Sequence, residues 1–353
     1  MRYVQPRPSS IVAALYTLRD LNVDLAILHG PSGCSFKHAR LLEEDGIRVL
    51  TTSLGDEEFI FGGENILADV LRYAEKTFSP RRIAVVGTCV SMIIGEDLDA
   101  GIEVSGITTP SIGVSIHAGF RENIDGVIAA LEPAARVGWI SEEELERQKR
   151  VLAAANRTER ERGAACKTYI SPSRGDLKHI AAAELIALLR SGKKGMAIMN
   201  AKKETAYMFA DHLCALHETV PEANLTYVAN LEARGLPKVR LDASTILAEL
   251  NSRGIFPELI GALDEYGENG ARIAEKIAEE KPEFILLVGV PHAVSPSALT
   301  GITVFSVTNG PRQVLPLKEQ GHAHVIVEID LHPKTLGVHN IVESEFGAVI
   351  RSL

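Results

Sequence analysis

Short apolar runs alternate with helix-like segments along the first third of the chain. Three runs have the length and composition of buried strands, at 24–28, 48–54 and 82–87. Residues 64–78 have helical spacing, and Pro8-Ser9-Ser10 precedes an apolar run with serine at a helix-cap position. Continuous apolar strands separated by helices are typical of a parallel sheet covered on both faces. The pattern predicts an α/β fold.

A densely charged segment interrupts this alternation. Between Ser141 and Arg162, twelve of the 22 residues are charged, six of each sign, and no strand-like run occurs. Such a pattern is typical of a solvated helix with i,i+4 ion pairs. We expect three parts: a first Rossmann-like domain at 1–140, a charged helical connector at 141–190, and a second Rossmann-like region at 191–353.

The strand and helix alternation resumes after Gly195. Expected strands lie at 196–199, 225–228, 284–288, 303–305 and 325–327, and expected helices near 203–217, 243–253 and 267–280. These strands form either one sheet or two small ones.

Composition and charge narrow the classes of protein to which the chain can belong. The chain carries 37 Lys and Arg against 46 Asp and Glu, a net charge of −9, whereas nucleic-acid binders usually carry a basic patch. No apolar run approaches the roughly 20 residues of a membrane-spanning helix, and no signal peptide is apparent. We expect a cytoplasmic protein without nucleic-acid or membrane partners, whose four cysteines are reduced thiols.

Several common catalytic motifs do not occur in the sequence. They are G-x-x-x-x-G-K-[ST], G-x-G-x-x-G, C-x-x-C, H-E-x-x-H and G-x-S-x-G. The chain therefore shows no nucleotide site of its own.

Two cysteines follow expected strands. Cys34 ends the loop after the first strand, and Cys89 ends the loop after the third. In a parallel sheet both positions are carboxyl ends, the edge where α/β proteins bind ligands. The nearby glycines would let a bulky group approach the backbone: Gly30, Gly33 and Gly87. Thiolates there suit an iron–sulfur cluster, and two small buried thiols are the alternative.

Polar residues near these loops are candidates for other roles. Three histidines are candidate catalytic groups: His29, His38 and His117. For His29 the alternative is a hydrogen bond that orients the loop. Lys37 and Arg40 could pair with substrate carboxylates, with plain solvation as their alternative.

The remaining candidates carry weaker signals. Cys166 is either a further cluster ligand or a buried thiol, and Cys214 is expected in the core of an apolar-periodic helix. His322 and His324 form either a metal pair or polar positions of an edge strand. Glu64 is expected at the N-terminus of a helix rather than on a metal.

Five motifs occur in order between residues 29 and 120. They are H-G-P-S-G-C-S (29–35), T-T-S-L-G-D (51–56), F-G-G-E (61–64), G-T-C with I-G-E-D (87–89 and 94–97), and H-A-G-F (117–120). Together they resemble the first domain of the nitrogenase component 1 superfamily, which includes tetrapyrrole reductases. The resemblance is close over the first third of the chain and architectural beyond it, and it implies Rossmann-like parallel-sheet domains of the nitrogenase component 1 type.

The resemblance implies that Cys34 and Cys89 are cluster ligands at a subunit interface. No cysteine precedes Cys34, so the further upstream ligand of the family is missing. A [4Fe–4S] cluster shared across a homodimer is therefore expected instead of an eight-iron cluster.

The runs at 35–40 and 59–65 look most like the small tetrapyrrole-reducing members. This implies an enzyme that receives electrons from a separate ATP-hydrolysing, iron-protein-like reductase. It would reduce a nickel tetrapyrrole, Ni-sirohydrochlorin a,c-diamide, and close a γ-lactam ring on the route to coenzyme F-430 of methanogenesis. Two alternatives stay open: a non-catalytic scaffold for metallocofactor assembly, and a small-molecule-binding protein without metal.

Overall fold

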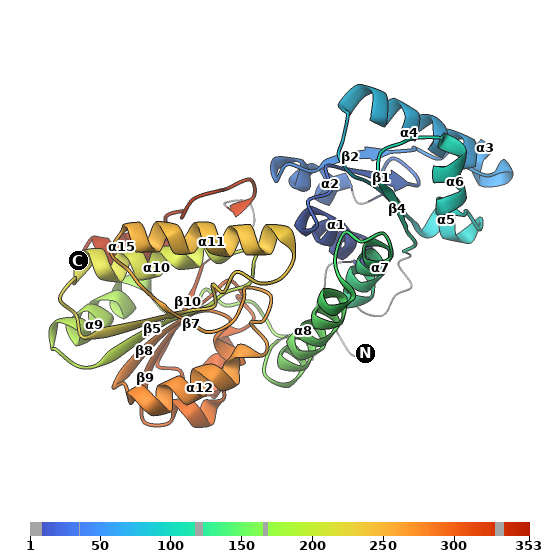
Figure 1. Cartoon of the computed structure of the whole chain (residues 1–353). Coiled ribbons are helices and arrows are strands. Elements are labelled where there is room, and N and C mark those ends of the chain that lie inside the picture. The colour runs from blue at the N-terminus through green and yellow to red at the C-terminus, as the bar shows by residue number, and fades with distance from the viewer. Residues whose placement is uncertain (1–8, 35, 117–122, 165–168, 329–334) are drawn as a thin grey trace. The chain divides into compact units, whose positions relative to one another are not determined.

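The fold is built on two parallel β-sheets (Figure 1). The computed structural model describes residues 9–34, 36–116, 123–164, 169–328 and 335–353. Contacts divide the chain into a first unit, residues 9–149, and a second unit, most of residues 150–353. The predicted α/β fold is confirmed.

The first unit contains a four-stranded sheet of order β2-β1-β3-β4. Its strands are β1 (Leu25–His29), β2 (Arg48–Thr51), β3 (Ile83–Gly87) and β4 (Ser111–Val114). Its helices are α1 (Ser10–Asp20), α2 (Phe36–Glu44), α3 (Asp56–Phe61), α4 (Glu64–Phe78), α5 (Cys89–Ile93), α6 (Leu98–Ser105) and α7 (Asn123–Arg136). The helix α8 (Glu142–Glu161) begins in this unit and continues into the second.

Both faces of this sheet are covered by helices. Leu67 and Leu71 of α4 pack against Leu25 and Ile27 of β1, and α6 packs beside α4 (Figure 1). The pair α1 and α7 packs on the other face, where α1 contacts β3 and α7 contacts β4. The α1 helix begins as expected, since the Ser9 hydroxyl accepts a hydrogen bond from the Val12 N–H at 3.4 Å.

The second unit contains one six-stranded sheet of order β10-β9-β8-β5-β6-β7. Its strands are β5 (Gly195–Asn200), β6 (Leu225–Ala229), β7 (Glu258–Leu259), β8 (Phe284–Gly289), β9 (Thr303–Thr308) and β10 (His324–Val327). Its helices are α9 (Lys178–Arg190), α10 (Ala206–Thr219), α11 (Pro237–Ser252), α12 (Asn269–Glu280), α13 (Val314–Glu319), α15 (Glu345–Arg351) and the short η1 (Pro291–Ala293) and η2 (Pro296–Leu299).

The core of this unit lies between the sheet and its helices. Ile273 and Ile277 of α12 pack against β5 and β8 side chains such as Ile198 and Leu287. On the opposite face α10 contacts the same two strands and packs against α15 (Figure 1). Among the described residues, no helix is both long enough and apolar enough to cross a bilayer.

The charged segment forms α8, a helix as predicted, but it is not wholly solvated. Its buried positions recur three or four residues apart: Leu145, Gln148, Val151, Ala154, Ala155, Thr158 and Glu159. Two ion pairs within it have i,i+3 spacing, Glu144–Arg147 and Glu146–Lys149, and Gln148 donates a hydrogen bond to Glu144 at i,i+4 spacing. Leucine, valine and two alanines supply the apolar part of this buried stripe, and polar side chains supply the rest.

Candidate functional site

The loops of Cys34 and Cys89 leave neighbouring strands at the same edge of the first sheet. β1 and β3 pair in parallel with His29 opposite Gly87, the last residue of each strand. Cys34 closes a turn in which its N–H donates to the Pro31 carbonyl at 3.0 Å, and Cys89 is the first residue of α5. Both cysteines are half-buried. We call this edge, made of residues 29–34, 51–55 and 87–89, the cysteine edge.

The two loops contact each other directly at their bases. The Thr88 hydroxyl donates to the His29 carbonyl at 3.0 Å. A Cβ at position 30 would lie 2.3 Å from the Thr88 hydroxyl oxygen, so only glycine fits at Gly30. A Cβ at Gly87 would lie 3.2 Å from Leu98, whereas one at Gly33 would meet no atom within 4 Å. Close packing therefore explains why glycine occurs at positions 30 and 87, whereas Gly33 faces open space. A role of these three glycines in binding a cofactor stays a prediction.

The His29 side chain is fully buried beneath these loops. Its Nδ1 lies 3.1 Å from the Thr52 hydroxyl, and its Nε2 lies 3.3 Å from a carboxylate oxygen of Glu96. Burial lowers the pKa of His29 and outweighs the opposing effect of the Glu96 carboxylate. This geometry fits the alternative in which His29 orients the loop, and a catalytic role for it stays a prediction.

Of the four further residues predicted for the site, the structure fully describes Lys37 and Arg40. Lys37 is exposed on α2, and Arg40 lies one turn later with its guanidinium 3.0 Å from Glu43. His38 lies in α2, but its side chain is outside the described part of the structure. His117, like Cys166, lies outside the described residues altogether.

The structure accounts for two side chains outside the cysteine edge. Glu64 is the first residue of α4, as expected. Cys214 is fully buried in α10, and burial raises the pKa of its thiol to about 12, so the core prediction is confirmed.

His322 and His324 do not form a metal pair. The Nδ1 of His322 lies 2.6 Å from the Ser306 hydroxyl, whereas Nε2 of His324 lies 2.8 Å from Glu184 and its ring stacks on Phe305. β10 is an edge strand, and His322 precedes it. The edge-strand alternative is therefore the correct one for His324.

Stability at mildly acidic pH should depend on His322. Burial lowers the pKa of His322 to about 4, against 6.5 in the unfolded chain. Below pH 6.5 the His322 side chain binds a proton in the unfolded state, whereas in the folded state it does so only near pH 4. The free energy of unfolding therefore falls as the pH falls through that window. A drop of about 2 kcal/mol is expected between pH 6.5 and 5. Urea unfolding at both pH values should show a smaller drop in His322→Gln, and equal drops would contradict the assignment.

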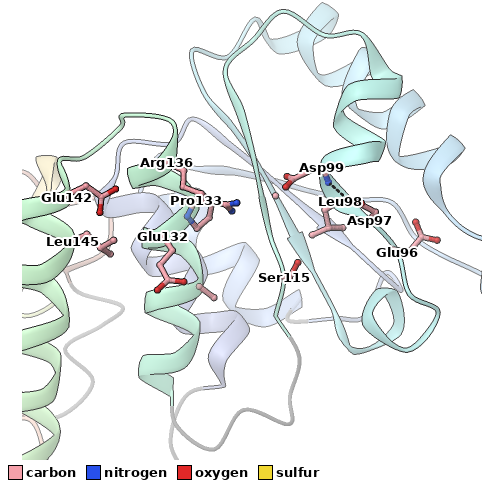
Figure 2. Close-up of a pocket in the computed structure, with 12 residues that line it drawn as sticks. Glu96, Asp97, Leu98, Asp99, Ser115, Glu132, Pro133, Arg136, Glu142 and Leu145 are labelled. Atoms are coloured by element: carbon pink, nitrogen blue, oxygen red, sulfur yellow. Dashed lines mark hydrogen bonds between the residues drawn. The ribbon is translucent and has the colours of Figure 1, made fainter.

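A large pocket in the same unit is lined by residues 96–99 and by side chains of α7 and α8 (Figure 2). It has a volume of about 810 Å³, within the usual range of ligand sites. Its charged lining consists of five carboxylates and one guanidinium: Glu96, Asp97, Asp99, Glu132, Glu142 and Arg136. Asp97 also caps α6, since its carboxylate accepts from the N–H groups of Asp99 and Ala100. A substrate with many carboxylates would be repelled here.

Apolar side chains are exposed around the two cysteine loops. On α3, Phe59, Ile60 and Phe61 are 50%, 71% and 82% exposed, and no residue of this helix is buried. On α5, which begins with Cys89, Met92 and Ile93 are 37% and 72% exposed. Exposed large apolar side chains on neighbouring positions of one helix, as at residues 59–61, are typical of an interaction surface.

Sequence reasoning did not single out three polar residues that build this site. Thr52, Thr88 and Glu96 bond to His29 or to its carbonyl. Each lies inside one of the five motifs, so the motifs contained the signal, but only the fold shows that these residues meet.

The parallel-sheet fold and the cysteine edge agree with proteins of the nitrogenase component 1 type, and the chain belongs to that family. The family model described as "Nitrogenase component 1 type Oxidoreductase" matches residues 10–219. The family resemblance seen in the motifs is thereby confirmed.

Individual relatives extend the similarity beyond the motifs. The chain is 52% identical to "Ni-sirohydrochlorin a,c-diamide reductive cyclase complex, component CfbD" of Methanosarcina acetivorans, over 99% of this chain and 97% of that protein. It is 46% identical to the protein of the same name from Methanothermobacter thermautotrophicus, over 99% and 98%. It is 32% identical to the nitrogenase molybdenum-iron protein alpha chain of Clostridium pasteurianum, over 29% of this chain and 20% of that one.

Proposed function

We propose that this chain is the catalytic component of a nitrogenase-like reductive cyclase. It reduces Ni-sirohydrochlorin a,c-diamide and closes a γ-lactam ring, with electrons from a separate ATP-hydrolysing, iron-protein-like reductase. The observation that carries the proposal is the placement of Cys34 and Cys89 on one sheet edge, in a chain similar over nearly its whole length to proteins named as a component of that complex. A cytoplasmic location belongs to the same proposal, since reduced thiols suit that compartment.

The residues of the cysteine edge fit a [4Fe–4S] cluster. Its usual protein ligands are four cysteine thiolates, and each chain offers two half-buried thiols here. Cys214 is unsuited because it is buried in the core of the second unit. Two copies related by a two-fold axis would bring Cys34 and Cys89 of both to one site. Met92 and Ile93 lie within one turn of Cys89, so the same contact would bury them against the second copy.

The chain's own residues then have separate tasks in the reaction. When bound, the cluster supplies electrons one at a time. Cys34 and Cys89 would hold it, and the hydrogen bonds of His29 fix the geometry at the start of the loop that carries Cys34. Lys37 and Arg40, on α2 directly after the first cysteine loop, bind carboxylates of the tetrapyrrole. Ring closure requires an amide nitrogen held against a neighbouring macrocycle carbon, a proximity effect that a rigid site provides.

Removing both cations of α2 should weaken substrate binding. An exposed ion pair contributes roughly 1 kcal/mol or less, so the Lys37→Ala/Arg40→Ala variant should raise KM about tenfold with little change in kcat. Steady-state kinetics over a range of tetrapyrrole concentrations measures both constants. Lys76→Ala, which removes an exposed lysine from the far end of α4, is the matched control. A KM equal to that of the control would remove these residues from the substrate site.

A turnover assay tests the proposed function itself. Anaerobic protein is mixed with the reductase, ATP and Ni-sirohydrochlorin a,c-diamide, and the tetrapyrrole is followed by mass spectrometry. Reduction and cyclisation that require all components support the proposal. Tetrapyrrole that returns unchanged, together with transfer of a metallocofactor to another protein, would establish the scaffold function instead.

A further inference from the structure

One buried carboxylate joins the segments that surround the cysteine edge. The Glu96 side chain is only 7% exposed, and one of its oxygens lies 3.3 Å from Nε2 of His29. The other oxygen accepts a hydrogen bond from the Gly63 N–H at 2.5 Å. The backbone N–H of Glu96 donates to the Ser91 carbonyl of α5 at 2.9 Å. Glu96 therefore connects the strand leading into the first cysteine loop, the helix that opens with the second cysteine, and the turn after α3.

One assignment of protons satisfies all the hydrogen bonds around the His29 ring. Thr52 Oγ1 accepts from the Gly30 N–H at 3.0 Å, so its proton is free to be donated to Nδ1 of His29. Nε2 then carries the ring proton and donates it to Glu96. An acceptor at position 96 thus fixes both the tautomer and the orientation of the buried ring.

We propose that Glu96 is a positioning residue that fixes the separation of the two cysteine loops for cluster binding. The inference rests on the proposed cluster at Cys34 and Cys89. Glu96 acts on the first loop through His29, whose carbonyl accepts a hydrogen bond from the Thr88 hydroxyl. It acts on the second loop through its backbone hydrogen bond to α5. Outer-shell groups that orient metal ligands typically contribute about 10–100-fold to metal affinity.

Two substitutions at this position separate positioning from bulk stability. Glu96→Ala leaves the Gly63 N–H and the His29 ring without their acceptor. Glu96→Gln keeps an acceptor oxygen for Gly63, and its amide N–H can donate to the other tautomer of His29. The matched control is Asp24→Ala, because Asp24 is also a carboxylate that accepts hydrogen bonds from backbone N–H groups, here those of Arg81 and Arg82, at the opposite edge of the same sheet.

The experiment measures iron release from anaerobic holoprotein to a colorimetric iron chelator, and the electron paramagnetic resonance spectrum of the reduced protein. Glu96→Ala should release iron at least about tenfold faster than wild type with an altered spectrum, and Glu96→Gln should stay within about twofold. Asp24→Ala should lower the thermal midpoint without either change.

Glu96→Ala with the release rate and spectrum of Asp24→Ala would overturn the positioning role and leave the proposed function intact. Wild-type protein without iron would overturn the proposed function and this inference together.

Discussion

A Cys34→Ser variant is expected to lose its iron and its turnover while keeping its fold. Cys34 is half-buried in a loop after β1, and the substitution changes a single atom outside the sheet core. A serine hydroxyl is a poor iron ligand beside a thiolate. Loss of a direct ligand should exceed the outer-shell effect, so iron content should fall by more than about tenfold. Iron analysis of anaerobically purified protein, with circular dichroism for the fold, measures both parts.

Cys214→Ala is the matched control for this variant. Its thiol is fully buried in α10, a helix of the second unit, whereas Cys34 belongs to the first. The substitution should lower stability by about 1 kcal/mol and leave the iron content unchanged. Full iron content in Cys34→Ser would contradict the ligand role of that residue.

The second large effect is expected on the quaternary state. If two copies share one cluster, cluster binding and dimer formation are coupled, so each strengthens the other. Cys89→Ala should therefore raise the dimer dissociation constant by at least about tenfold as it loses the cluster. Anaerobic sedimentation over a range of concentrations measures this constant, with Cys214→Ala as control. A Cys89→Ala dimer as tight as the wild type would show that the cluster does not hold the two copies together.

The strand pattern allowed most of the fold to be predicted. Each of the eight runs expected as a strand overlaps one. Six of these strands are mostly buried and read as continuous apolar segments, whereas β2 and β6 are only partly buried and were predicted from their β-branched and aromatic residues. Two strands were missed for identifiable reasons. β4 is only half-buried and includes Gly113, and β7 consists of two exposed residues, Glu258 and Leu259. Neither has the apolar continuity that the prediction needs.

The candidate site was predictable where it depends on strand register alone. Cys34 and Cys89 follow strands that are adjacent in the parallel sheet, so their shared edge follows from the fold class. The roles of the glycines were not predictable, because the close fit of Gly30 against Thr88 depends on a contact 58 positions apart. The bond between His29 and Glu96 spans 67 positions and is likewise invisible to any local pattern.

The number of irons bound per dimer tests the central claim most directly. A cluster shared by Cys34 and Cys89 of two copies predicts about four iron atoms per dimer. Ligation within each chain, with Cys166 as a further ligand, would give about eight by the same count. Native mass spectrometry of the anaerobic protein reports chains and irons in one spectrum. A dimer carrying one [4Fe–4S] cluster is the expected result; a dimer carrying two clusters, or a monomer carrying its own, would contradict the shared site.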